Sequence, residues 1–110
     1  MALVGVISRE PNPPGVDLDQ WRRIVATDRR LRRPPERNIT NPFTGKPAVH
    51  VPPDTDAVIV VDESAIGAIT VSDADDGELD VWSADGHREV AQAVAIAIAV
   101  ELGGRYTSIP

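Results

Sequence analysis

The side chains best suited to catalysis in this 110-residue chain are its two histidines, His50 and His87. A catalytic histidine needs a nucleophile within reach and a carboxylate that orients the ring. His50 lies in the proline-flanked sequence VHVPP, His87 lies where a helix is expected to begin, and no serine stands in a Gly-x-Ser-x-Gly elbow. The residues therefore predict no catalytic site. An enzyme of unrecognised type, built around His50 and the irregular stretch 33–53, is the alternative.

No residue pattern in the sequence supports a metal or cofactor site. The chain has no cysteine, and its two histidines lack the spacing of a zinc site. The acidic run 73–85 fails as a calcium loop, because Gly77 at the sixth position would place Ala74 at the third and Ser83 at the twelfth. Neither G-x-G-x-x-G nor a Walker sequence is present. We expect no metal and no cofactor.

Charge is the property that divides the chain. Residues 1–53 hold nine Lys/Arg and five Asp/Glu, a balance of +4, whereas residues 54–110 hold two and twelve, a balance of −10. Such a separation shapes what a surface attracts more than it shapes a fold. We therefore expect a protein that docks on another molecule.

The basic residues concentrate between Arg22 and Arg37. On a helical register Arg22, Arg29 and Arg33 fall on one stripe, which would suit an acidic protein surface or phosphates. Asp19 and Asp28 are interspersed, so a solvated helix face neutralised by local pairs is the other reading. The net charge of −6 argues against nucleic acid as the partner.

The acidic candidates surround a predicted hairpin turn at Asp76-Gly77. They form either a solvated turn or an acidic edge that contacts a basic partner. The residues concerned are Asp73, Asp75, Asp76, Asp80 and Asp85.

The segment Asn41–Gly45 (NPFTG) predicts a tight turn, since proline presets φ and glycine tolerates a positive φ. Phe43 then has two interpretations. It plugs the edge of a small core, or it is presented at the tip of a loop for protein recognition. Trp21 has the same two interpretations, and its place on an apolar helix stripe favours the core.

These residues must be positioned by an α+β fold, a mainly antiparallel sheet of four to five strands with two helices packed on one face. The expected order is strand, helix, optional strand, three strands, helix, in one domain over 1–110 with an irregular proline-rich loop at 33–53. The first helix begins at the Asp17 cap and should end near Leu31, because Pro34 cannot continue it. Strands are expected at 3–8, 48–51, 57–61, 66–71 and 78–82, a helix at 87–102, and a paired or extended tail at 105–109. The strand at 57–61 and the second helix are continuously apolar and are expected to be buried on all sides.

No stretch resembles a signal peptide or a membrane span. Together with the absence of cysteine, this favours the cytoplasm and excludes a membrane partner.

The order of a strand VGVISRE, a tryptophan helix LDQWRRIVATDRRL, the turn NPFTGKP and a closing helix ending in AVELGGRY resembles a group of small uncharacterised bacterial proteins. The group implies no activity, cofactor or catalytic residue. Its members have the size of immunity proteins that neutralise toxins.

The residues thus predict a non-enzymatic, cytoplasmic protein-binding domain, in its most specific form an immunity-type inhibitor whose acidic surface covers a basic protein. A self-assembling structural subunit, in which the arginine stripe of one copy meets the acidic hairpin of the next, is the third class.

Overall fold

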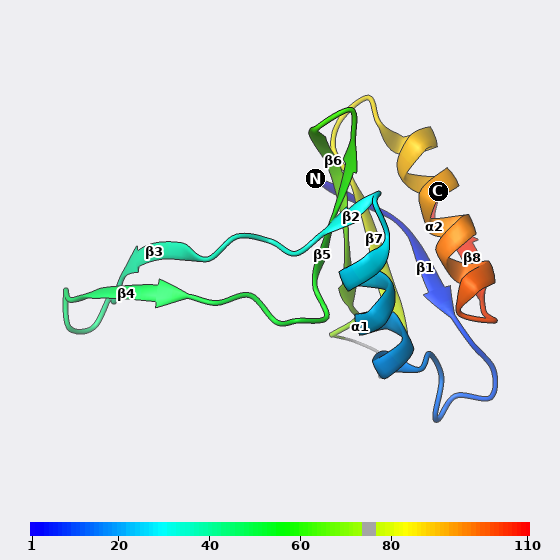
Figure 1. The fold of residues 1–110 in the computed structure, drawn as a ribbon, viewed down its shortest axis with the longest axis horizontal. Helices are drawn as coiled ribbons and strands as arrows, with labels where there is room; N and C mark the ends of the chain where they lie inside the picture. The colour runs from blue at the N-terminus through cyan, green and yellow to red at the C-terminus, as the bar shows by residue number, and fades with distance from the viewer. Residues whose placement is uncertain (74–76) are drawn as a thin grey trace.

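A six-stranded antiparallel sheet forms the centre of the computed structural model, which describes residues 1–73 and 77–110. Its strands are β1 (Ala2–Ser8), β2 (Leu31–Arg32), β5 (Ala57–Val61), β6 (Ser64–Val71), β7 (Leu79–Ser83) and β8 (Arg105–Ser108). They lie side by side in the order β2-β5-β6-β7-β1-β8, and every neighbouring pair is antiparallel (Figure 1). Of these five strand pairs, β5-β6 and β6-β7 are hairpins, and the other three join strands far apart in the sequence.

Two helices, α1 (Leu18–Thr27) and α2 (Arg88–Glu101), pack on one face of this sheet (Figure 1). The Gln20 side-chain amide donates to the Glu101 carbonyl over 2.9 Å, which joins the start of α1 to the end of α2. Trp21 is fully buried between helix and sheet, and its indole N–H donates to the Thr55 carbonyl. The core interpretation of Trp21 is confirmed.

The α+β class is confirmed, but the predicted strand count is wrong. The main sheet has six strands because Leu31–Arg32, expected at the end of the first helix and just after it, pairs with β5, and because the tail pairs with β1 as β8. The strand expected at 48–51 exists, shifted by one residue, but belongs to a separate two-stranded sheet.

Helix α1 ends four residues earlier than expected. The Asp28 carboxylate accepts the backbone N–H of Arg30 over 2.9 Å and also pairs with the Arg30 guanidinium at 2.7 Å. A side chain that bonds its own backbone two residues on offers the chain a turn instead of a further helical turn. Leu31 is thereby directed into the core as part of β2.

The strand at 57–61 and the second helix are not buried on all sides, contrary to the prediction. In β5, Ala57 and Ile59 are buried while Val58 is half-buried, because no helix of the described chain covers the other face of the sheet. The expected helix at 87–102 is present as α2, yet Val90, Ile96 and Val100 are exposed on it. Continuous apolarity therefore did not mean burial in either element.

The predicted hairpin between β6 and β7 is present. Val71 pairs with Leu79, and the Ser72 N–H donates to the Glu78 carbonyl over 2.9 Å. Gly77 has a φ of +81°, which suits glycine. Asp76, the first residue of the predicted turn, lies outside the described residues.

Candidate functional site

A two-stranded arm projects from the body of the molecule (Figure 1). It consists of β3 (Arg37–Thr40) and β4 (Pro47–His50), and the segment 33–53 that contains them is called the arm below. The strands are antiparallel, with Arg37 opposite His50 and Thr40 opposite Pro47. The stretch that was expected to be an irregular loop is therefore partly a hairpin.

The tip of the arm is an ordered turn. The Asn41 side-chain oxygen accepts the N–H groups of Phe43 at 2.9 Å and Thr44 at 3.3 Å. The Gly45 N–H donates back to the Asn41 carbonyl, and Gly45 has a φ of +69°. Asparagine side chains commonly close turns in this way, so the turn predicted from NPFTG is confirmed.

Phe43 lies at this tip and is 95% exposed. Of its two interpretations, the structure therefore excludes the ring that plugs a core edge. Ile39, Val49 and Val51 are also exposed along the arm. Large apolar side chains are usually buried against other apolar groups, whereas on the arm they are exposed to solvent.

The base of the arm is anchored on both sides. Leu31 and Pro52 are buried, and Arg22 from α1 pairs with Asp54 at 3.1 Å. The arm thus begins from a fixed point of the sheet.

Burial raises the pKa of Asp56 above its ordinary value, the nearby Asp73 carboxylate adds to the rise, and His50 opposes it.

The predicted arginine stripe does not exist. Arg22 is on α1, but Arg29 lies in the turn after the helix and Arg33 lies beyond β2. Arg22 pairs with Asp19 at 2.9 Å as well as with Asp54, and both carboxylates raise its pKa. The helical register assumed for the three residues fails because Asp28 ends the helix.

The acidic candidates are spread along the β6–β7 hairpin. Asp73 is exposed just after the end of β6, Asp80 is half-buried within β7, and Asp85 is exposed beyond the end of β7. Asp75 and Asp76 lie outside the described residues. The three described carboxylates therefore flank and occupy β7 without forming one cluster.

Both histidines lie on the surface of the molecule. His50 is exposed on β4, and His87 is exposed at the start of α2 without capping it. Within residues 1–73 and 77–110, no three His, Cys, Asp or Glu side chains come together as metal ligands would. The geometry lends no support to the alternative of an enzyme around His50.

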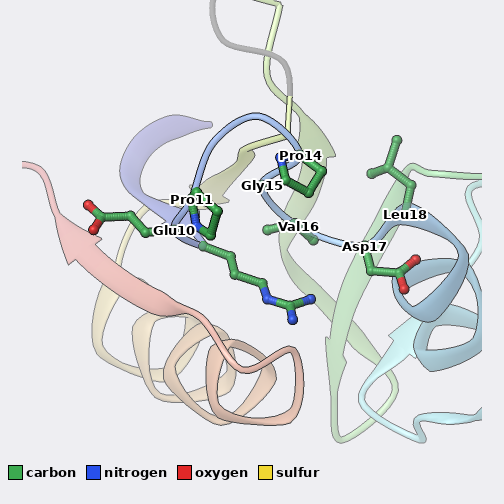
Figure 2. Close-up of a pocket in the computed structure, with 8 residues that line it drawn as sticks. Glu10, Pro11, Pro14, Gly15, Val16, Asp17 and Leu18 are labelled. Atoms are coloured by element: carbon green, nitrogen blue, oxygen red, sulfur yellow. The ribbon is translucent and has the colours of Figure 1, made fainter.

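One pocket was not predicted from the sequence. A cavity of about 460 Å³ opens beside the start of α1, and Figure 2 shows Pro11, Pro14 and Val16 around it. The Glu10 carboxylate turns away from it and pairs with Arg105 of β8, while Asp17 is occupied as the cap of α1. None of the lining residues is a histidine or a serine, so the pocket brings no catalytic pair together. The prolines of this segment signal a break in regular structure, which does not reveal a cavity.

In the described part of the chain, neither helix is long and apolar enough to cross a membrane. No family model, curated protein or solved structure matches the chain. The resemblance to small bacterial proteins consequently stays a prediction.

Proposed function

We propose that this chain is a protein-binding domain without chemistry of its own, and that the arm is its binding element. The observation that carries the proposal is the 95% exposure of Phe43 on an ordered turn at the end of a projecting hairpin. Aromatic side chains in the centre of an interface commonly supply much of its binding energy. Phe43 is therefore the anchor.

The shape of the arm favours a protein over a small molecule as partner. Small ligands bind in concave pockets that bury most of their surface, whereas a two-stranded hairpin is convex. An isolated hairpin is also only marginally stable in water, so contact with a partner surface would stabilise the arm. The partner accordingly provides the concave or flat side of the interface.

The charge of the molecule bears on the class of partner. At a net charge of −6, the chain attracts a basic protein over long range and speeds the encounter. The more specific proposal is therefore an immunity-type inhibitor, active in the cytoplasm, whose acidic body faces a basic protein while the arm makes the apolar contact. Because Asp73, Asp80 and Asp85 are spread along the β6–β7 hairpin, we ascribe the attraction to the whole acidic body and not to one patch.

The test is affinity purification from the source cell with tagged wild-type and Phe43→Ala chains. The variant should lose a bound protein by more than tenfold, since truncating an anchor of this kind costs about 2 kcal/mol or more. Thr40→Ala, on the same arm, serves as the control and should retain the protein. Equal recovery with Phe43→Ala would show that the arm is not the binding element.

A further inference from the structure

The exposed large apolar side chains gather in two places. Apart from Met1, they lie either on the arm or on the outer face of α2. On the arm they are Ile39, Phe43, Val49 and Val51, and on α2 they are Val90, Ile96 and Val100. The strand register puts Ile39 and Val49 on different faces of the arm, whereas Ile96 and Val100 share one face of α2.

The outer face of α2 is an apolar strip bounded by acids. Ala93, Ile96 and Val100 follow the three- and four-residue spacing of one helix face, and all three are exposed. Glu89, which is exposed, continues this face one turn before Ala93, and Glu101, also exposed, ends the helix about 100° around from Val100. Negative charge therefore lies in line with the strip at its start and beside the strip at its end.

The nearby arginines are engaged elsewhere. Arg88 donates to the Ser108 hydroxyl and to the Ile109 carbonyl, which holds it against the C-terminal strand. The Arg30 guanidinium, which attracts Glu101, is held by two hydrogen bonds to Asp28. The acids at the ends of the strip are thus open to basic groups from another molecule.

One face of the arm has the complementary order of charges. Side chains directly opposite each other, and at every second position, share a face of a hairpin. The register therefore places Arg37, Ile39 and Lys46 on one face, with Ala48 opposite Ile39. This face is basic at both ends and apolar in the middle. Residues 33–53 carry a net charge of +2, and the remainder of the chain carries −8.

The two strips also agree in length. Arg37 and Lys46 stand about 13 Å apart along the hairpin at roughly 3.3 Å per residue. Glu89 and Glu101 stand about 18 Å apart along α2 at 1.5 Å per residue. The long arginine, lysine and glutamate side chains readily span the difference.

The arm and α2 lie on opposite sides of the molecule, so the two strips of one copy cannot meet (Figure 1). We propose that the arm of one copy docks on the outer face of α2 of a second copy, in a head-to-tail contact. The inference rests on the proposed role of the arm as the binding element, and it gives the arm a second copy of this chain as partner in place of the basic protein of the immunity-type proposal. Pairing of α2 with α2 is disfavoured, because antiparallel helices would bring Glu89 against Glu101. A head-to-tail contact repeats, and it closes into a ring or continues as a filament.

The test is sedimentation of purified chains from roughly 1 µM to 1 mM, the range in which weak association is visible. The wild-type mass should rise with concentration. Ile96→Asp removes the α2 strip and Ile39→Asp removes the arm strip, and each variant alone should stay monomeric. An equimolar mixture of the two should form a one-to-one dimer and nothing larger, since it retains one intact arm and one intact α2 face. Thr40→Asp, on the other face of the arm, is the matched control and should associate as the wild type does.

A second pair of variants tests the same contact by charge reversal, in case Ile39→Asp disturbs the hairpin. Arg37→Glu with Lys46→Glu should abolish association. Mixing with the Glu89→Lys, Glu101→Lys chain should restore head-to-tail assemblies of alternating chains, because each chain's arm then matches the charge of the other chain's α2. A wild-type chain that stays monomeric throughout, or variants that associate like the wild type, would overturn the inference. A monomeric chain whose Phe43→Ala variant still loses a bound cellular protein would leave the proposed function standing.

Discussion

At the scale of single residues, Asp28 decides where α1 ends and where the arm begins. Its carboxylate binds both the backbone and the guanidinium of Arg30, which turns the chain toward β2. The Asp28 side chain is only 11% exposed, so this pair is better shielded from water than the other ion pairs of the described chain. It is therefore the ion pair from which a measurable stability effect is expected.

We expect Asp28→Ala to lower the free energy of unfolding by about 1–2 kcal/mol, because it removes hydrogen bonds to a charged partner and to a turn N–H. Hydrogen bonding to Arg30 lowers the pKa of Asp28. Its stabilising contribution is therefore present above the ordinary pKa of aspartate and is lost as the pH falls through the lowered value. Urea unfolding at neutral and acid pH measures both effects. Glu36→Ala, an exposed control, should change little, and an equal loss for both variants would contradict the assignment.

The contribution of Asp56 to the free energy of unfolding has the opposite pH dependence. Burial, followed by repulsion from Asp73, raises its pKa, so its ionised form destabilises the folded state. That penalty is absent below the ordinary pKa of aspartate and grows as the pH rises through the raised value. Asp56→Asn should therefore be more stable than the wild type near neutral pH, with the difference vanishing in acid. A thermal melt series across pH measures it, and a variant less stable at neutral pH would refute a destabilising role for the ionised carboxylate.

At the scale of elements, the arm stands apart from the core. Its strands β3 and β4 pair only with each other among the described elements, and no residue of either strand is buried. The side chains that hold the base of the arm, Leu31 and Pro52, lie outside the hairpin. The arm therefore contributes little to the stability of the sheet.

Replacing residues 37–50 with a four-residue Gly-Ser linker should leave the urea midpoint of the body nearly unchanged. Shortening a surface loop alters closure entropy by only about 0.6 kcal/mol per halving of its length. The replacement should nevertheless abolish both the capture of a partner and the association of copies. A large fall in the midpoint would show that the hairpin supports the fold, and would weaken the case that it is kept for binding.

At the scale of the whole molecule, charge is arranged so that the arm is basic and the rest is acidic. Raising the ionic strength shortens the range of such attraction, from about 10 Å at 0.1 M to about 3 Å at 1 M salt. The concentration needed for half-maximal association of copies should therefore rise several-fold over that range. Glu89→Gln with Glu101→Gln should remove most of this salt dependence. Unchanged salt dependence in that variant would place the attraction elsewhere on the body.

Local patterns were sufficient for most of the elements. The β-branched runs predicted β1, β5, β6 and β7, and the Asp17 cap with its apolar stripe predicted the start of α1. These signals work because they depend on neighbours within one turn or one strand. The NPFTG turn belongs to the same class, since Asn41 bonds residues only two and three positions away.

Long-range contacts decided the rest. Leu31–Arg32 is a strand only because β5 lies beside it, and nothing within its own neighbourhood indicates that pairing. The outer face of β5 is only half-buried and that of α2 is exposed because no other element of the described chain covers them, although their composition resembles that of buried segments. The arginine stripe failed for a related reason, since it assumed that the helix continued past Asp28.

The sequence by itself determined the class of fold, the positions of the main strands and helices, the NPFTG turn and the opposed charges of the two halves. These properties follow from residue composition and from interactions between close neighbours in the chain. Only the tertiary structure decided that Phe43 stands in solvent at the end of an arm, and that the outer face of α2 is an acid-bounded apolar strip. Exposure depends on what packs against a residue, and residues far away in the sequence decide whether anything does.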